Sequence, residues 1–319
     1  MRAAENVKRR AAVININAIA VSKVADMTRE EFQASRSSKL GASDVASLMG
    51  HGFGTALSVY VNKIEGEEVP DSLQMEVGRE LEPFVRRKFL EHIRNTEGVE
   101  LELQEAYVWA HIKHRYLQAT PDDIVWHPGK EKYIGAEYKT ASAYMKGKFS
   151  DEEVPTGYYI QCQAGMLVTG LDEWYLAYLV GNNIFNVVSI PRNEQVIEEI
   201  GNVCVNFWQN HVLAEVPPAP TGEYIDSAAL KAIYPGGEGE IELPELEETY
   251  DQIKKLAKEK KSIEKEIESL KQQVMDAMEN HEVAILGYDG DKPKKASWKM
   301  GKDVPVQAHI RKGTRVFRI

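Results

Sequence analysis

Two stretches carry the strongest structural signal in this chain: ATPDDIVW at residues 119–126 and IGAEYKTA at residues 134–141. Each stretch contains short apolar runs that are typical of strands, and the turn sequence HPGK lies between the two. Glu137 and Lys139 are two positions apart, so in a strand their side chains project from the same face. A hairpin of the two strands would place Asp122 beside Glu137.

This arrangement has a chemical consequence. Two neighbouring carboxylates repel each other unless a cation neutralises them. Oxygen ligands without His or Cys favour Mg²⁺, with Mn²⁺ able to substitute, over zinc. A lysine beside them, here Lys139, can position or help to deprotonate a water and can stabilise charge on a phosphate. Asp122, Glu137 and Lys139 therefore fit metal-assisted phosphodiester hydrolysis. The same residues also fit a purely structural interpretation, because Asp after Pro is common in turns and Glu-Tyr-Lys is common on a solvated strand face.

The composition bounds the possibilities. Of the 319 residues, 43% are hydrophobic and 28% are charged, as in a globular protein with one large domain or one domain plus an appendage. No apolar run reaches the roughly 18 residues that cross a bilayer. Cys162 and Cys204 have no neighbour at metal-ligand spacing, which is typical of buried thiols in a reducing compartment. The net charge of −10 argues against a general nucleic-acid coat, but not against a DNA enzyme with a few local basic groups.

The chain divides into three parts. Residues 1–27 are interpreted as an N-terminal extension of a cytoplasmic protein, residues 28–216 as the core, and residues 217–319 as a C-terminal region that follows the proline-rich VPPAP stretch. Periodicity and capping residues predict helices at 29–37, from Ser43 as N-cap, from about 55, at 75–94, at 158–170 and at 193–215. Strands are expected at 100–110, 117–126, 133–140, 173–180 and 186–191.

The C-terminal region predicts a long helix over about 244–282, with apolar residues at spacings of three or four and Lys260 interrupting the seam. Such a helix either packs on its own domain or in a helical hairpin, or serves as an arm for self-association or a partner. Both interpretations remain open from the sequence. The tail from about 283 onward is expected to form short strands, and it is rich in Lys and Arg.

Several motifs in a fixed order resemble one family. Asp122 after Pro121, followed by Glu137-x-Lys139, resembles the PD-(D/E)xK nuclease superfamily. More closely, the chain resembles the YqaJ-like viral recombinases, relatives of phage lambda exonuclease. The supporting blocks are Arg36 with GASD (41–44), GRELEP (78–83), ATPDD (119–123) and YIQCQ (159–163) followed by Thr169-Gly170. The resemblance covers about residues 28–190 and says little about residues 215–319.

The resemblance implies roles for individual residues. Glu82, Asp122 and Glu137 would bind the metal, with the main-chain carbonyl of Tyr138 as an extra ligand. Lys139 would act on the nucleophilic water, and Gln161 would support the site by fixing that water or Lys139. The positions that would bind a terminal 5′-phosphate are Arg36, Ser43 and Thr120. Each also has an ordinary structural explanation: first-turn helix chemistry for Glu82, an N-cap for Ser43, a polar helix flank for Gln161 and a surface charge for Arg36.

The chain departs from the family pattern at three positions. Asp123 replaces the glycine after the motif Asp, which leaves open whether it joins the metal site. Thr120 replaces serine but keeps the hydroxyl, and Ala42 replaces the second glycine of its block. No position that the resemblance makes catalytic is lost.

The resemblance also implies a fold and an activity. The expected fold is α/β, a restriction-endonuclease-like core with a central mixed sheet flanked by helices, plus a C-terminal helical arm and a small β tail. The expected activity is a Mg²⁺-dependent 5′-to-3′ exonuclease that digests one strand of linear double-stranded DNA and leaves a 3′ overhang. Homologues of this kind form homotrimeric rings and work with a single-strand annealing protein in the cytoplasm of a bacterial host, which points to a phage or prophage origin.

Two rival interpretations remain. An endonuclease, a RecB-like nuclease or an iron–sulfur nuclease associated with CRISPR systems could use the same fold, although two cysteines are too few for a cluster that needs four. A non-catalytic DNA-binding or assembly protein could also have kept the fold. Intact Glu82, Asp122, Glu137 and Lys139 argue against that loss of activity.

Overall fold

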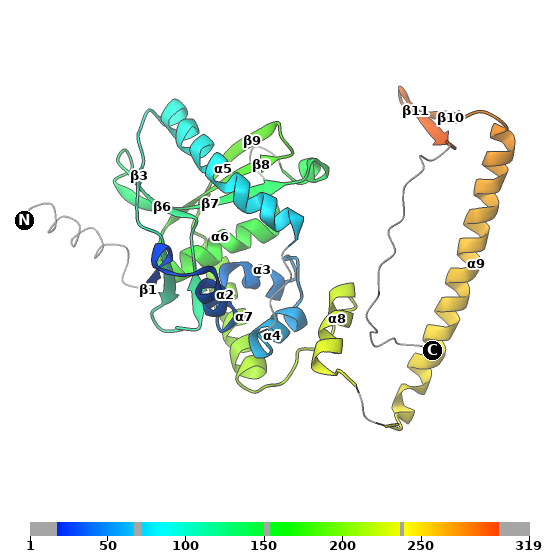
Figure 1. The fold of residues 1–319 in the computed structure, drawn as a ribbon, viewed down its shortest axis with the longest axis horizontal. Helices are drawn as coiled ribbons and strands as arrows, with labels where there is room; N and C mark the ends of the chain where they lie inside the picture. Colours follow the sequence, from blue (N-terminus) through cyan, green and yellow to red (C-terminus); the bar gives the residue numbers. More distant parts are fainter. Residues whose placement is uncertain (1–17, 67–71, 150–153, 237–238, 300–319) are drawn as a thin grey trace, which may run out of the picture. The chain divides into compact units, whose positions relative to one another are not determined.

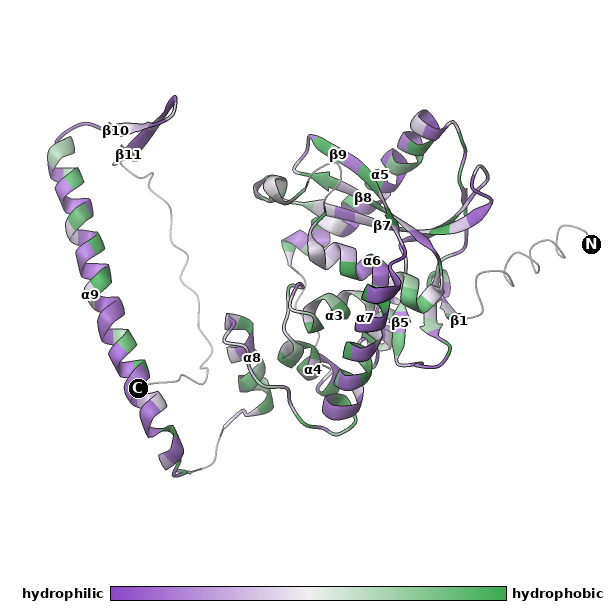
Figure 2. Ribbon diagram, turned by 180° about the vertical axis from the view of Figure 1, so that it is seen from behind, coloured by the Kyte–Doolittle hydropathy of each residue, from purple (hydrophilic) through white to green (hydrophobic). Residues whose placement is uncertain are grey.

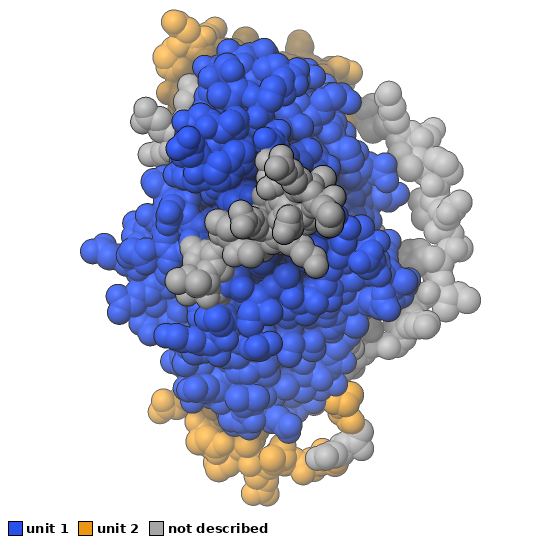
Figure 3. All heavy atoms as spheres, turned by 90° about the vertical axis from the view of Figure 1, so that its left-hand side faces the viewer, with its two compact units in different colours: residues 1–234 blue, residues 235–319 orange. Residues whose placement is uncertain are grey.

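The computed structural model describes residues 18–66, 72–149, 154–236 and 239–299. The chain forms two compact units, residues 1–234 and 235–319 (Figure 3). Most of the expected N-terminal extension and the end of the basic tail lie outside the described residues. None of the described helices is both long and apolar enough to cross a membrane.

A five-stranded sheet forms the centre of the first unit, in the order β3-β6-β7-β8-β9. Its strands are β3 (Glu102–Leu103), β6 (Asp123–His127), β7 (Lys132–Ala141), β8 (Glu173–Val180) and β9 (Ile184–Pro191). β7 and β8 run parallel, whereas the other neighbouring pairs are antiparallel. The expected fold class is therefore confirmed: an α/β core with a mixed sheet flanked by helices (Figure 1).

Two helices cover opposite faces of this sheet, α5 (Leu73–Glu97) and α6 (Thr156–Thr169) (Figure 1). Side chains alternate between the faces along each strand. In β8, Tyr175 and Ala177 belong to the core under α5, whereas Trp174 and Leu176 belong to the core that contains α6. All eight residues of β8 are buried, as expected for a strand that is covered on both sides.

A second sheet of four strands stands beside the first, in the order β1-β4-β5-β2. Its strands are β1 (Ala18–Lys23), β4 (Tyr107–His111), β5 (Leu117–Ala119) and β2 (Leu40–Gly41). The expectation of one strand over 117–126 was wrong, because β5 and β6 belong to different sheets. The chain leaves β5 before Pro121, which lacks an N–H for a sheet hydrogen bond. The expected strand over 100–110 divides in the same way, into β3 and β4.

The helices before the motif begin largely where their capping residues predict. Helix α2 (Arg29–Ser37) has Thr28 in a capping box with Glu31, and α4 (Ala56–Ile64) has Thr55 as its N-cap. Helix α3 (Ala42–Leu48) differs from the prediction, because Gly41 rather than Ser43 is the N-cap. The Asp44 carboxylate accepts a hydrogen bond from the Gly41 N–H and so completes this helix start. The Ser43 hydroxyl is thereby left for another role.

The first unit extends past the proline-rich stretch at which the sequence placed the main boundary. Helix α7 (Glu194–Phe207) continues as a π-helical turn, Trp208–Val212, and is followed by α8 (Tyr224–Ile233). The buried carboxylate of Asp226 in α8 accepts a hydrogen bond from the Thr55 hydroxyl at the start of α4. This contact fastens α8 to the core, so the unit ends at Tyr234 rather than near residue 216.

The second unit consists of a long helix and a hairpin. Helix α9 (Glu247–Met278) is followed by the antiparallel strands β10 (Val283–Asp289) and β11 (Lys292–Ser297). Apolar positions recur along α9 between charged ones (Figure 2). Most of these large apolar side chains are exposed, and of the residues in α9 only Met278 is buried. Short 3-10 helices complete the described chain at Val24–Asp26, Ala143–Lys148 and Pro244–Leu246.

Candidate active site

Asp122 lies in the break between the two sheets, immediately before β6 begins. Its carboxylate Oδ2 accepts a hydrogen bond from the main-chain N–H of Tyr138 in β7, at 2.6 Å. This bond holds Asp122 against the strand that carries Glu137 and Lys139. Burial raises the pKa of Asp122 well above its ordinary value, and the negative charge of Glu137 raises it further. The site therefore holds negative charge that the protein compensates only in part.

Glu137 and Lys139 lie on the face of β7 that is turned toward α6. The Lys139 ammonium lies 2.6 Å from Oε1 of Glu137, and the side-chain amide of Gln161 in α6 donates to the same oxygen. Burial alone would lower the pKa of Lys139, but the charges of Glu137 and Asp122 outweigh it and raise that pKa above its ordinary value. Lys139 is therefore a cation in this arrangement. It is a hydrogen-bond donor and a positive charge rather than a free base.

Asp123 has different surroundings from Asp122, although the two are adjacent in sequence. Its oxygens accept hydrogen bonds from the Arg86 guanidinium in α5 and from the Tyr138 hydroxyl, both at 2.7 Å. The side chain is 3% exposed. Burial raises the pKa of Asp123, while its hydrogen bond with Tyr138 and the charge of Arg86 oppose the rise. Both carboxylate oxygens of Asp123 are thus engaged on the α5 side of the sheet.

Glu82 projects from α5 and is solvent-exposed on one side. Its partial burial raises its pKa, and the negative charges of Glu137 and Asp123 add to that effect. Glu82 is therefore within electrostatic reach of the other carboxylates. Among the residues that the structure describes, however, no three Asp, Glu, His or Cys side chains already converge as a metal cage.

The donor atoms available nevertheless fit one class of metal. The carboxylates of Asp122 and Glu137, with Glu82 near them, offer only oxygen, which Mg²⁺ and Mn²⁺ prefer. Burial first, and then the negative charges of Glu137 and Glu82, raise the pKa of Asp122, and a divalent cation would offset both effects.

The residues expected to bind a phosphate are partly brought together. The Arg36 guanidinium donates to the Ser43 hydroxyl at 2.9 Å. Strand β2 pairs with β5 in parallel, with Gly41 opposite Gln118, so Ser43 and Thr120 each follow this pair by two residues at the same end of the strands. Arg36 is exposed and Thr120 is half-buried. The hydroxyls of Ser43 and Thr120 and the guanidinium of Arg36 can therefore face one region beyond these strand ends.

Three residues near these sites were not predicted from the sequence. Tyr158 in α6 places its ring 5.6 Å from the Lys139 ammonium, and Arg86 holds Asp123. The buried ammonium of Lys63 in α4 lies 2.7 Å from the Asp44 carboxylate and donates to the main-chain oxygen of Arg36. Helical spacing was an available signal for two of them, because Tyr158 precedes Gln161 by three residues and Arg86 follows Glu82 by four.

Both cysteines are buried free thiols, as expected. Burial raises the pKa of Cys162 well above its ordinary value and raises that of Cys204 to about 12. Neither thiol is therefore a reactive group at neutral pH.

The mixed α/β core thus carries Asp122, Glu137, Lys139 and Gln161 close together. Residues 31–172 match the family model of the YqaJ-like viral recombinase domain. The match confirms, over this segment, the family resemblance that the motifs indicated.

Several known proteins are similar to the chain. The uncharacterised protein YqaJ of Bacillus subtilis (strain 168) is 28% identical over 279 residues, which cover 84% of this chain and 83% of that protein. The alkaline exonuclease LHK-Exo of Laribacter hongkongensis, solved in complex with dAMP, is 22% identical with a TM-score of 0.47, covering 63% of this chain and 98% of that one. A phage-related exonuclease of Haemophilus somnus 129PT is 12% identical with a TM-score of 0.39, covering 56% and 96%.

Proposed function

We propose that this protein is a metal-dependent exonuclease that degrades one strand of linear double-stranded DNA from 5′ to 3′. The observation that carries the proposal is the cluster on β7, in which Lys139 and Gln161 both bind Oε1 of Glu137 while Asp122 is held against the same strand. A cluster of buried carboxylates around a lysine is costly to maintain for stability alone. Its presence in a YqaJ-like viral recombinase domain supports phosphodiester hydrolysis.

In this proposal Asp122, Glu137 and Glu82 hold Mg²⁺, with the carbonyl of Tyr138 as a further ligand and Mn²⁺ as a substitute. When bound, the cation supplies Lewis-acid polarisation of the phosphate and a lower pKa for a coordinated water. Lys139 orients the attacking water and stabilises the charge that develops on the phosphate. Gln161 fixes the carboxylate of Glu137 by its amide and so positions both Glu137 and Lys139.

A separate group of residues makes the enzyme dependent on DNA ends. Arg36 offers a guanidinium that binds a phosphate through two hydrogen bonds, and Ser43 sits in the first turn of a helix, where backbone N–H groups also face an anion. Thr120 adds a hydroxyl from the neighbouring strand end. Together they would bind a terminal 5′-phosphate and so set the polarity of digestion.

The remaining parts of the proposal concern the assembly. We propose a homotrimeric ring around the DNA and a single-strand annealing protein as partner, acting in the cytoplasm of a bacterial host. A ring resolves the conflict between a net charge of −10 and a polyanionic substrate, because enclosure rather than charge keeps the enzyme on DNA.

A comparison of end-labelled substrates tests this function. Linear duplexes with and without a 5′-phosphate, each labelled at one end, are incubated with the protein in Mg²⁺ and in EDTA. We expect Mg²⁺-dependent loss of the 5′ label first, faster with the phosphate than without, and no cutting of covalently closed circles. An Arg36→Gln variant should lose the preference for the phosphate while still digesting DNA.

The rival functions give different results in the same assay. An endonuclease would cut closed circles, and loss of the 3′ label first would reverse the polarity. A non-catalytic DNA-binding protein would release no nucleotides in any metal. Each of these outcomes contradicts the proposal.

A further inference from the structure

The charge of the chain is distributed unevenly. Nine of its 39 Lys and Arg residues lie within residues 292–319, together with a single one of its 49 acidic residues. The rest of the chain is therefore even more acidic than the net charge of −10 suggests. A basic end on an acidic protein is typical of a segment that binds a polyanion.

The described part of this basic segment begins on the β10–β11 hairpin. Lys292, Lys294, Lys295 and Lys299 are all exposed. Within the part of the chain that the structure describes, none of these four lysines forms an ion pair. Lysines on α9 differ, since Lys260 and Lys271 each lie near a glutamate one turn away. These four lysines thus carry positive charge that no ion pair among the described residues occupies, and they can contact phosphates.

Aromatic side chains lie among these lysines. Tyr288 is 65% exposed and Trp298 is 48% exposed. Tyr288 pairs with Pro293 across the hairpin, and Ile285 pairs with Lys295. Cross-strand partners share a face, and Pro293 and Lys295 are two residues apart in β11, so Tyr288 lies on the same face as Lys295. Lys292 and Lys294 lie on the other face of the hairpin. Exposed aromatic rings interleaved with lysines are the combination by which proteins bind single-stranded nucleic acids, the rings stacking on bases and the cations contacting phosphates.

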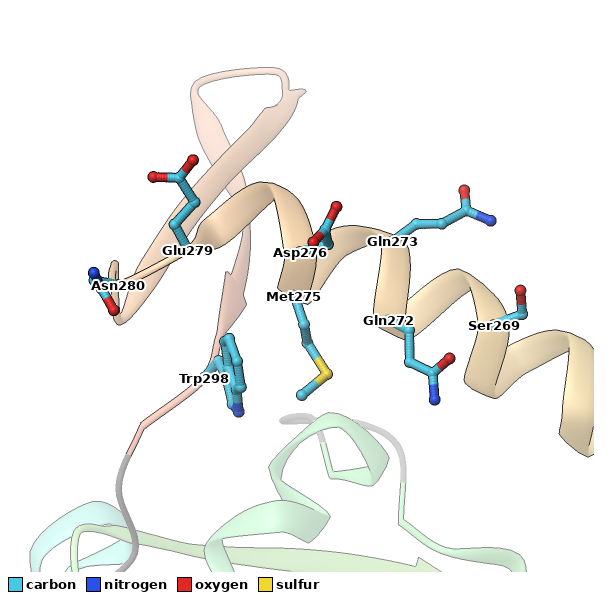
Figure 4. A pocket seen from close by; sticks show the side chains of 8 residues that line it. All are labelled: Ser269, Gln272, Gln273, Met275, Asp276, Glu279, Asn280 and Trp298. Atoms are coloured by element: carbon cyan, nitrogen blue, oxygen red, sulfur yellow. The ribbon is translucent and has the colours of Figure 1, made fainter.

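Trp298 lies near the end of α9, in surroundings that suit a nucleic-acid base. Trp298, Met275 and Gln272 line a shallow recess within the second unit, and their side chains point to one side of it (Figure 4). The carboxylates of Asp276 and Glu279 point to the other side (Figure 4). An indole and a thioether offer a stacking surface, and the amide of Gln272 can hydrogen-bond to the edge of a base. Asp276 and Glu279 nevertheless line the same recess.

We propose that the β10–β11 hairpin, with Trp298 and Lys299, is a binding site for single-stranded DNA that is separate from the nuclease centre. Its lysines contact phosphates, and Tyr288 and Trp298 stack on bases. The inference rests on the proposed function in one respect: the strand bound is the one that survives digestion. The binding itself needs neither metal nor catalysis.

Equilibrium binding of the full chain in EDTA tests the site without turnover. The probes are a labelled oligothymidylate of about 16 nucleotides, the upper size that a small single-strand site covers, and a duplex of equal length. A variant with Lys292, Lys294, Lys295 and Lys299 changed to Gln should bind the oligothymidylate more weakly. Its plot of log affinity against log salt should be shallower by about 3, since each phosphate contact on a single strand contributes about 0.7. A Tyr288→Ala/Trp298→Ala variant should lose at least about thirtyfold in affinity with the salt slope unchanged.

Matched controls come from α9, which belongs to the same unit. Changing Lys255, Lys258, Lys261 and Lys265 to Gln alters the net charge equally, and Tyr250→Ala removes another exposed ring. We expect these variants to bind as the wild type does. Far-UV circular dichroism checks that all variants keep their helix content.

Three outcomes would overturn the site. Unchanged affinity in the hairpin variants removes it outright. Equal losses in the α9 variants reduce it to an effect of net charge. A loss confined to the duplex makes the hairpin a double-strand contact instead. Failure of the nuclease proposal is distinguishable, because a chain that releases no nucleotides would still bind the oligothymidylate through the hairpin.

Discussion

Two adjacent aspartates show how sharply the fold separates roles at the scale of single residues. Asp122 lies outside the strand and is drawn to β7 by the N–H of Tyr138, whereas Asp123 is the first residue of β6 and binds Arg86 and the Tyr138 hydroxyl. The sequence left open whether Asp123 shares the metal site. Its hydrogen bonds with Arg86 and Tyr138 connect it to the packing of α5 on the sheet.

Substitution of each aspartate by asparagine should separate these roles. Asp122→Asn should lower the rate of nucleotide release by at least about a hundredfold, as loss of a group that stabilises the transition state does. It should not lower stability, because it removes a buried charge that is repelled by Glu137. Asp123→Asn should keep the rate within a few-fold. It should lower the free energy of unfolding by about 1–3 kcal/mol, since an asparagine amide matches the two donors, Arg86 and Tyr138, less well than a carboxylate does. Nuclease assays and urea unfolding measure both, and equal loss of rate in the two variants would contradict the assignment.

Glu173 provides a pH-dependent contribution to stability. Burial by itself would raise its pKa, but hydrogen bonds from Lys130, Lys132 and Ser189 outweigh burial and hold the pKa at about 2. A folded-state pKa below the ordinary 4.5 means that the stabilisation is complete above about pH 4.5 and is lost as the pH falls toward 2. Glu173→Gln should therefore be less stable than the wild type at pH 7 by about 2 kcal/mol. The difference should shrink in unfolding curves recorded near pH 3, and a difference that stays constant with pH would refute this origin.

At the scale of elements, the start of α4 joins two parts of the first unit. The Thr55 hydroxyl accepts the N–H of Ser58 as an N-cap and donates to the buried carboxylate of Asp226 in α8. One hydroxyl therefore both begins a helix and fastens another. Asp226 also binds the N–H and hydroxyl of Thr221.

Removal of this hydroxyl should cost more than an ordinary cap. Thr55→Ala should destabilise the protein by about 2–4 kcal/mol. Loss of the N-cap contributes about 1 kcal/mol, and the buried Asp226 carboxylate that loses its donor contributes about 1–3 kcal/mol. Thr55→Ser keeps the hydroxyl and should lose much less. Chemical denaturation of both variants provides the measurement. If serine and alanine were equally destabilising, the loss would come from the methyl group rather than from the two hydrogen bonds.

The sequence predicted the elements whose signals are local. The β6–β7 and β8–β9 hairpins and helices α2, α4 and α6 follow from alternation, helical spacing and capping residues. The division of residues 117–126 between two sheets did not, because the apolar run is nearly continuous and only Pro121 interrupts it. The preference of serine for the N-cap position predicts Ser43 there, but Gly41 is the N-cap and the Asp44 carboxylate binds its N–H. Pairings between distant residues, such as Thr55 with Asp226, have no local signal.

The candidate site likewise combines features that have a local sequence signal with contacts between distant residues. Spacing alone placed Glu137 and Lys139 on one face, and the structure brings Gln161 to Glu137 rather than to Lys139. The metal itself, the role of Glu82 and the phosphate-binding group remain predictions. Helical spacing links Arg86 to Glu82 and Tyr158 to Gln161, but the groups that they contact, Asp123 and Lys139, lie on other elements and have no local signal.

At the scale of the whole molecule, the two units differ in how they bury apolar surface. The first unit has a core on each face of its central sheet, whereas α9 exposes most of its apolar seam. The packing of that seam within a helical hairpin, one of the two interpretations open from the sequence, does not occur among the described residues. A partner for the seam stays a prediction, as do the homotrimer and the annealing protein.

The most direct measurement is nucleotide release from 5′-phosphorylated linear duplex DNA in Mg²⁺ by the wild type and Lys139→Ala, with the exposed Lys231→Ala as a matched control. The account predicts steady release by the wild type and Lys231→Ala, none in EDTA, and a rate at least about a hundredfold lower for Lys139→Ala. Equal rates for the wild type and Lys139→Ala, whether fast or slow, would show that the cluster of Asp122, Glu137 and Lys139 is not a nuclease centre.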